Sequence, residues 1–291
     1  MRFWRYKYFA DFDLDGDRVK DVVISGYAGY NGHPLGFFLT AGAEGALADR
    51  TEAAGLPKDA APILLADLDA DGHVDLVSAR GGGGIFLNDG KGKFTLKPGP
   101  ATDFLRKDGP YLHVAYAEDF DADGDLDLVL VNPRHKSTAI FEHAGKGEFK
   151  CIHAQQSWDS DPIAIADFNA DGRPDVAIGG PDTAITILLN AAATGNYCNL
   201  SLRMDAPNRF AAGARVEAFK AGELAKENAL PFARFVAPAD GFPIHLGLGE
   251  AKTFDLRVVF PGKESKPLTL FSVEARPRVT IAPAGLEEDS K

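Results

Sequence analysis

Cysteine is scarce in this chain, because the 291 residues include only two, Cys151 and Cys198. Two thiols can form at most one disulfide, or they can be two separately buried small apolar side chains, and the sequence leaves both alternatives open. Disulfide bonds can therefore supply little of the stability, and most of it must come from a buried apolar core. With 45% hydrophobic residues, the chain is long enough to bury a sizeable core.

Excess positive charge and long apolar runs are also lacking. The chain has 31 Lys and Arg residues against 42 Asp and Glu residues, which gives a net charge of −11. Because binding to phosphates needs clustered basic residues, we expect no nucleic-acid partner. No run reaches the length of about 18 apolar residues that spans a bilayer, so no transmembrane segment is expected. The first residues contain no long apolar stretch, and no signal peptide is visible.

Aspartate is concentrated in one phrase that occurs four times. The phrase begins at Asp11, Asp67, Asp119 and Asp167, at spacings of 56, 52 and 48 residues. Self-similarity at such a period is typical of repeat architectures. Because neighbouring carboxylates repel each other, their crowding indicates that a cation binds there. An alternative is that the phrases are acidic β-turns without a metal, since Asp and Gly are common turn residues.

Short apolar segments on both sides of each acidic phrase predict β-strands. In the second repeat, residues 62–66 precede the phrase, residues 75–79 follow it, and residues 84–89 form a third run before a turn with glycines. Four strands in a repeat of about 40 to 50 residues are typical of a propeller blade. We therefore predict an all-β fold with a β-propeller of about four blades over residues 1–192. Residues 193–291 lack acidic phrases but keep β-type patterns, which predicts a second, small β-rich domain.

The spacing of the aspartates indicates calcium. In a regular loop the acidic residues stand at positions 1, 3, 5 and 9, with glycine at position 6 to permit a sharp turn. Calcium prefers six to eight oxygen ligands, and a carbonyl and water could complete the shell. We predict three to four Ca²⁺ sites. Whether the first loop binds calcium stays open, because counting from Asp11 puts its last aspartate at Asp21 rather than at residue 19. The predicted ligands are Asp11, Asp13, Asp15, Asp17 and Asp21; Asp67, Asp69, Asp71 and Asp75; Asp119, Asp121, Asp123 and Asp127; and Asp167, Asn169, Asp171 and Asp175.

The D-x-[DN]-x-D-G-x-x-D loops resemble the FG-GAP or VCBS repeats of calcium-binding β-propellers, over about residues 8–190. Residues 208–219 (NRFAAGARVEAF) and 245–263 (HLGLGEAKTFDLRVVFPGK) resemble the ASPIC/UnbV domain that follows such propellers in secreted proteins, the cartilage acidic proteins among them. Phe260 stands where that domain usually has Trp. The resemblance implies a propeller of seven blades, whereas four acidic loops are present. The propeller is therefore either a compact four-bladed ring or an incomplete one within a larger assembly.

The favoured interpretation is a calcium-stabilised, non-catalytic binding protein whose propeller loops bind a protein or a glycan. One alternative is a structural accessory subunit of a larger extracytoplasmic or membrane-associated complex. Another is a hydrolase or lyase acting on polysaccharides or phosphoesters, since a fold does not decide function. Known motifs such as G-x-S-x-G and H-E-x-x-H are absent, so catalysis is undecided and its absence is favoured. Extracellular calcium modules bind at about 10⁻⁴ to 10⁻³ M, so we expect an extracellular, periplasmic or cell-surface location.

Overall fold

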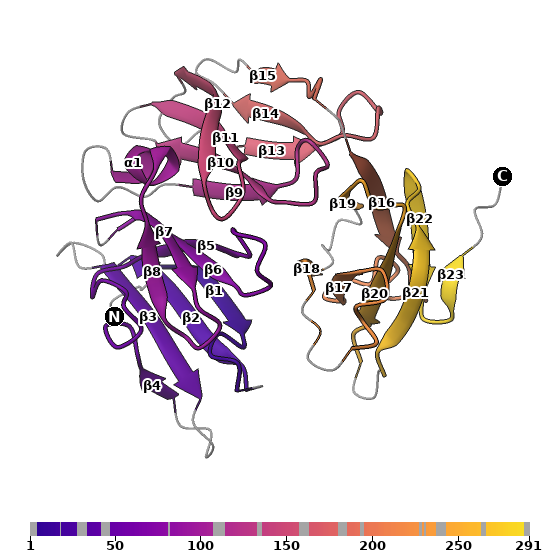
Figure 1. The fold of residues 1–291 in the computed structure, drawn as a ribbon, viewed down its shortest axis with the longest axis horizontal. Coiled ribbons are helices and arrows are strands. Elements are labelled where there is room, and N and C mark those ends of the chain that lie inside the picture. Colours follow the sequence, from indigo (N-terminus) through magenta and orange to yellow (C-terminus); the bar gives the residue numbers. More distant parts are fainter. Residues whose placement is uncertain are drawn as a thin grey trace. The chain divides into compact units, whose positions relative to one another are not determined.

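The structure is a computed structural model of the chain. It describes residues 5–17, 19–27, 34–41, 47–80, 82–106, 114–132, 136–156, 163–179, 185–192, 195–226, 229, 231–236, 243–262 and 266–287. Within these residues the fold consists of β-strands and one short helix, which confirms the all-β prediction (Figure 1). No helix in these ranges is long and apolar enough to cross a membrane. Contacts divide the chain into two compact units, one formed by residues 1–117, 126–163 and 178–186, and the other by residues 118–125, 164–177 and 187–291.

The repeats form small antiparallel sheets in which each strand lies beside the next one in the sequence. Three sheets have four strands, and a fourth has three strands among the described residues. This meander is the arrangement of propeller blades. The strands are β1 (Arg5–Phe12), β2 (Asp21–Tyr27), β3 (Pro34–Ala41) and β4 (Leu47–Asp49); β5 (Pro62–Ala66), β6 (Asp75–Ser78), β7 (Gly84–Asn88) and β8 (Phe94–Lys97); β9 (Val114–Glu118), β10 (Asp127–Asn132), β11 (Ser137–His143) and β12 (Phe149–Gln156); and β13 (Ile163–Ala166), β14 (Asp175–Gly179) and β15 (Ile185–Leu188).

The second strand of a blade is its most buried element. All residues of β6 and β10 are buried, which agrees with their continuous apolar sequences after the first aspartate. Leu76 packs in a core shared by the first two sheets, and Val77 and Leu128 pack in a core shared by the second and third sheets. The sheets therefore pack face to face through their central strands, as blades do.

The short helix α1 (Pro100–Arg106) was not expected from the sequence. Pro100 stands in the first helical position, Asp103 lies in the first turn and Arg106 in the last, and each of these placements favours a helix. Ala101 and Leu105 are buried in the core of the second and third sheets. The signals are present in the sequence, but they span less than two turns, which is too short for a periodic apolar pattern to predict a helix.

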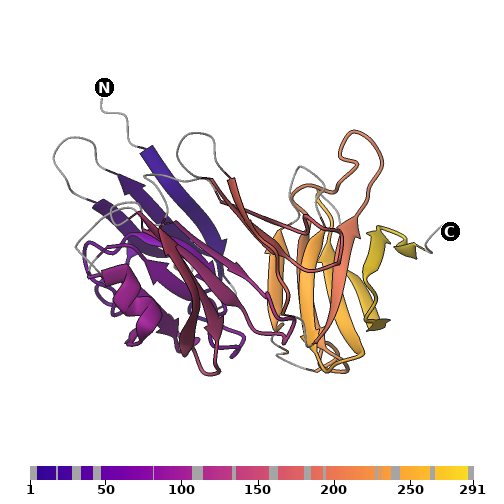
Figure 2. The same ribbon diagram turned by 90° about the horizontal axis from the view of Figure 1, so that it is seen from above.

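The C-terminal module, residues 195–287, has two four-stranded sheets with a core of their own, drawn in orange to yellow in Figure 2. One sheet contains β16 (Asn196–Leu202), β19 (Ile244–Gly249), β22 (Arg278–Ala282) and β23 (Gly285–Glu287). The other contains β17 (Arg215–Lys220), β18 (Ala233–Val236), β20 (Thr253–Val259) and β21 (Leu268–Glu274). Leu200 and Leu246 of the first sheet pack with Val216 and Leu256 of the second. The domain boundary after residue 192 stays a prediction.

The two cysteines are free, so the disulfide alternative is wrong, and the alternative of two buried side chains holds for only one of them. Cys198 is buried in the core of the C-terminal module, whereas Cys151 is exposed on β12. Burial raises the pKa of the Cys198 thiol to about 12, so this side chain is a small apolar core residue and not a reactive thiolate.

The asparagine at the end of β7 ties the second blade to the first acidic loop. The Asn88 amide nitrogen donates to the carbonyl oxygens of Leu14 (3.0 Å) and Val74 (3.1 Å), and Asn88 is only 4% exposed. Asn190, which follows β15, repeats this contact by donating to the carbonyl of Phe120 at 2.5 Å. The loops are therefore held at their backbones by buried amides.

Replacing Asn88 by Ala should destabilise the protein by about 1–3 kcal/mol, because two buried carbonyl oxygens lose their donor. Urea unfolding of the Asn88→Ala variant measures this loss. Gln156→Ala removes an exposed amide from β12 and serves as the matched control, with an expected change within about 0.5 kcal/mol. Equal stabilities of the two variants would show that the hydrogen bonds of the Asn88 side chain contribute nothing to the free energy of unfolding.

Candidate metal centres

The same hydrogen bond closes three of the acidic loops. In the second loop, the backbone nitrogen of Leu68 donates to Oδ2 of Asp75 at 2.7 Å. In the fourth loop, Phe168 donates to Asp175 at 2.9 Å. In each case the donor directly follows the first aspartate of the loop, so the bond fixes which residues occupy equivalent positions.

This bond changes the register of the first loop. Leu14 donates to Oδ2 of Asp21 at 2.8 Å, so the residue in the first position is Asp13. Asp11 belongs to β1, where it pairs with Val22. Counted from Asp13, the aspartates stand at positions 1, 3, 5 and 9, as in the regular loops. The apparent irregularity came from starting the count two residues too early.

The fourth position of each loop confirms this register, because its backbone has a positive φ in all four. The φ values are 79° at Gly16, 60° at Ala70, 58° at Ala122 and 60° at Ala170. For alanine, the left-handed conformation costs roughly 1–2 kcal/mol. The surrounding hydrogen bonds hold the three alanines in it, so the loop shape is determined strongly by its context.

Three of the loops bring carboxylates close enough to share one metal ion. The clusters are Asp13, Asp15 and Asp17 in the first loop; Asp67, Asp69 and Asp71 in the second; and Asp119, Asp121 and Asp127 in the third. In each cluster, one oxygen from every residue lies within 4.8 Å of the others. These nine residues are all among those predicted from the sequence. They offer only oxygen donors, which is the chemistry that hard cations such as Ca²⁺ prefer.

In the second loop, burial and mutual repulsion disfavour the charged form of the clustered carboxylates. Burial, opposed by a hydrogen bond from Gly72, raises the pKa of Asp67 to about 6. Burial and then the charge of Asp71 also raise the pKa of Asp69. The Oδ1 atom of Asp69 is buried without a hydrogen-bond partner. A divalent cation would favour the charged carboxylates and satisfy this oxygen, so the donor set fits a metal.

The ninth position joins the loop to its blade. Both oxygens of Asp75 accept backbone hydrogen bonds, from Leu68 (2.7 Å) and from Asn88 at the end of β7 (2.7 Å). Asp75 is fully buried, and burial raises its pKa to about 8. Each carboxylate oxygen has a second lone pair, so these bonds and a metal ligand are compatible. Sequence reasoning missed the strand-end partner, although Asn88 and His143 end their third strands and Asn190 follows its third strand by two residues.

The strand-end contact recurs in the other repeats. The backbone nitrogen of His143 donates to Oδ1 of Asp127 at 2.8 Å, and that of Asn190 donates to Oδ1 of Asp175 at 2.7 Å. The His143 ring is buried and its Nε2 accepts a hydrogen bond from the backbone of Gly147 at 3.1 Å. His143 therefore supports the turn after β11 as well as the third loop.

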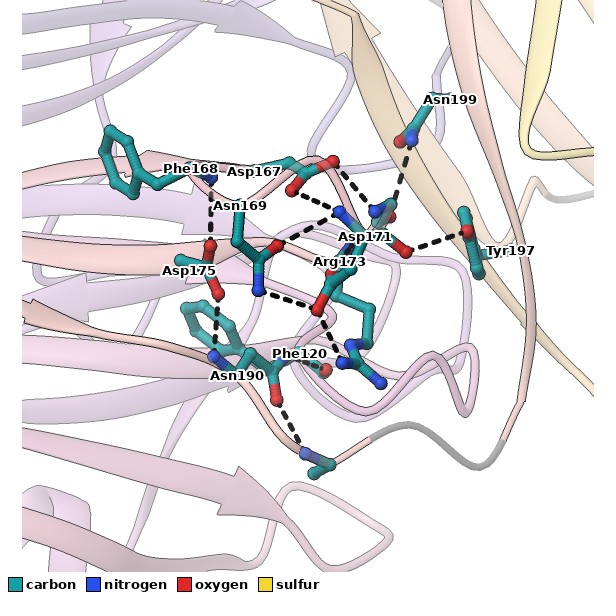
Figure 3. Close-up of polar contacts among 12 residues, drawn as sticks. Phe120, Asp167, Phe168, Asn169, Asp171, Arg173, Asp175, Asn190, Tyr197 and Asn199 are labelled. Atoms are coloured by element: carbon teal, nitrogen blue, oxygen red, sulfur yellow. Dashed lines mark hydrogen bonds and ion pairs between the residues drawn. The ribbon is translucent and has the colours of Figure 1, made fainter.

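The fourth loop differs in its polar contacts, which Figure 3 shows. Asp167 accepts backbone hydrogen bonds from Asp171 (3.0 Å) and Gly172 (2.8 Å), as Asp67 does in the second loop. Asn169 donates its side-chain amide to Oδ2 of Asp171 at 2.8 Å, and Arg173 reaches the same oxygen at 2.5 Å. The assignment of Asp167, Asn169, Asp171 and Asp175 as metal ligands stays a prediction.

The second, third and fourth acidic loops lie within a segment that matches a known type of repeat, and the match ends just after the fourth loop. Residues 67–130 and 119–178 match the family model of FG-GAP-like repeats. No curated protein matches the chain. Similar solved structures include a lectin from Agrocybe aegerita described as recognising non-reducing terminal N-acetylglucosamine, with 17% identity, a TM-score of 0.43, and 93% of this chain and 66% of the lectin covered.

Two further structures are more distant. An exotype rhamnogalacturonan lyase has 12% identity and a TM-score of 0.36, with 94% of this chain and 57% of the lyase covered. The Tc holotoxin pore of Photorhabdus luminescens has 17% identity and a TM-score of 0.30, with 89% of this chain and 11% of the toxin covered. The chain thus spans less than two thirds of the length of each of these structures. What the comparisons support for the chain itself is that residues 67–178 carry FG-GAP-like repeats.

Proposed function

We propose that this chain is a calcium-stabilised, non-catalytic binding protein that acts outside the cytoplasm and uses its loops to bind a protein or a glycan. The observation that carries the proposal is the recurrence of one oxygen-only cluster in three successive repeats. One acidic turn can arise by chance on a surface. Three in successive repeats, with aspartates at positions 1 and 3 in each and a third at position 5 or 9, favour a common ligand.

Calcium suits these clusters better than a smaller cation does. The three carboxylates of a cluster supply part of a shell of six to eight oxygens, and carbonyls and water can complete it. Magnesium needs near-ideal octahedral geometry and keeps several waters, so a loop that offers several carboxylates to one ion suits it less well. Asp13, Asp17 and Asp71 are exposed, which leaves these positions open to the solvent from which the ion comes.

The division between strands and loops supports binding over catalysis. The central strands are buried and serve the core, whereas the connections are the parts that can vary without disturbing it. We further propose that the C-terminal module is an ASPIC/UnbV-like domain that accompanies the propeller. Calcium dissociation constants of about 10⁻⁴ to 10⁻³ M would match an extracellular, periplasmic or cell-surface location.

Asp71→Ala should remove one calcium ion from the protein, because the remaining carboxylates of the second loop lose a ligand and still repel each other. Isothermal titration calorimetry measures the number of ions bound. Asp59→Ala removes an exposed aspartate outside the loops and should leave that number unchanged. An unchanged number in Asp71→Ala would count against the second loop as a site.

Chelation should loosen the blades while leaving the core of the C-terminal module intact. A ligand at 100 times its dissociation constant stabilises the folded state by about 2.7 kcal/mol, so three sites could contribute roughly 8 kcal/mol. Hydrogen exchange with and without EDTA should show lost protection in β6 and β10, and little change in β17 and β20 of the C-terminal module. Unchanged protection in β6 and β10 after proven removal of calcium would favour the alternative that the loops are acidic turns without a structural metal.

Binding and catalysis are separated by one further comparison. Incubation of the calcium-loaded protein with an array of glycans should give retained ligands that are released by EDTA. Incubation of the same glycans in solution should give no cleavage products by mass spectrometry. Cleavage of any glycan would overturn the non-catalytic part of the proposal, and a failure to retain glycans would leave a protein as the partner, which co-purification from the native host identifies.

A further inference from the structure

The fourth loop contains a cation of its own, the guanidinium of Arg173. Arg173 Nη2 lies 2.5 Å from Oδ2 of Asp171, and the backbone nitrogen of Arg173 donates to Oδ1 of the same residue at 3.0 Å. The repulsion that a metal would relieve elsewhere is relieved here within the chain.

The other contacts of the fourth loop also satisfy its oxygens within the chain. Asn169 replaces the aspartate found at position 3 of the other loops, and its amide donates to Oδ2 of Asp171 instead of adding a charge. Both oxygens of Asp167 accept backbone hydrogen bonds. The second loop has the same backbone bonds, from Asp71 and Gly72 to Asp67, but there a buried oxygen of Asp69 has no partner.

The tip of the fourth loop lies directly against strand β16. The Tyr197 hydroxyl donates to the carbonyl of Asp171 at 3.3 Å, and the Asn199 amide donates to the carbonyl of Gly172 at 3.4 Å (Figure 3). A Cβ on Gly172 would lie 1.9 Å from the Tyr197 hydroxyl, and the φ of 90° at this residue also favours glycine, so a side chain here would displace Tyr197.

The β16 residues are themselves held by β19. The Tyr197 ring stacks on His245 with a centroid distance of 5.5 Å, and Asn199 Oδ1 lies 2.9 Å from His245 Nδ1. Burial lowers the pKa of His245 to about 4, so the ring is neutral at pH 7 and adds no charge beside the loop. The surface that meets the loop is therefore preformed within the sheet of the C-terminal module.

We propose that the fourth loop is a metal-independent anchor, in which Arg173 takes the place of the cation and the loop tip holds β16 of the C-terminal module. This inference rests on the proposed function, because it assumes that the first three loops bind calcium. The chain would then combine calcium-dependent repeats with one joint that does not respond to calcium. Its third loop also contacts this module, through a 2.8 Å bond from Gly249 to the carbonyl of Ala122, and that contact should respond to calcium.

The proposal can be tested by creating a calcium site in the fourth loop and counting the bound ions. Native mass spectrometry should find three ions on the wild-type protein. Asn169→Asp combined with Arg173→His gives the fourth loop the ligand positions and the position-7 residue of the second loop, and this double variant should bind four. Four ions on the wild type, or three on the double variant, would overturn the proposal. No ions on the wild type would refute the proposed function, and the exchange of the Arg173 variants described below would then still test the anchor.

Hydrogen exchange compares three equivalent amides in two loops of one molecule. In EDTA, the amides of Asp71, Gly72 and His73 should lose protection by about tenfold or more, whereas those of Asp171, Gly172 and Arg173 should keep it. Equal losses in both loops would overturn the anchor.

Variants at Arg173 complete the test. Arg173→Ala should remove protection from the fourth-loop amides and from β16 even with calcium present, and Arg173→Lys should retain part of it because a cation remains. Arg203→Ala is the matched control, since Arg203 is an exposed arginine of the C-terminal module whose Nη1 lies 3.9 Å from Oε2 of Glu287, away from the fourth loop's contacts. Protection in Arg173→Ala equal to that of the control would show that the guanidinium does not hold the joint.

Discussion

Repulsion among clustered carboxylates is the constraint on which the rest of the structure depends. With oxygens within 4.8 Å, two unit charges oppose each other by about 3–4 kcal/mol at an effective dielectric constant of about 20. Backbone amides offset part of this cost, as the bonds from Asp71 and Gly72 to Asp67 show. They do not satisfy every oxygen. A bound cation completes the first three loops in our account, and an arginine completes the fourth.

The loops affect the packing of the whole blade because each one connects its first and second strands. The last aspartate of each loop is the first residue of the second strand: Asp21 in β2, Asp75 in β6, Asp127 in β10 and Asp175 in β14. Asp75, Asp127 and Asp175 also accept a hydrogen bond from the end of the third strand. A change in the charge of a loop therefore acts on the most buried part of the sheet, and this is how a bound metal would stabilise the core in our account.

The repeat, the strands and the aspartate clusters could be predicted from the sequence, because a two-residue alternation and a fixed loop spacing are local patterns. The register of the first loop could not, since Asp11 and Asp13 both continue the alternation and only the hydrogen bond between Leu14 and Asp21 separates them. The contact between the fourth loop and β16 was missed for a different reason. Tyr197 and Asn199, which donate to the carbonyls of Asp171 and Gly172, lie more than twenty residues away in the sequence, and nothing local indicates that contact.

The most direct test of this account is to locate the bound ions. Terbium can replace calcium at oxygen sites, and anomalous diffraction from crystals of the terbium-loaded protein reveals each ion. The account predicts peaks at the clusters of the first, second and third loops, and none beside Asp171, where Arg173 lies. If none of the three clusters had a peak, the account would be contradicted.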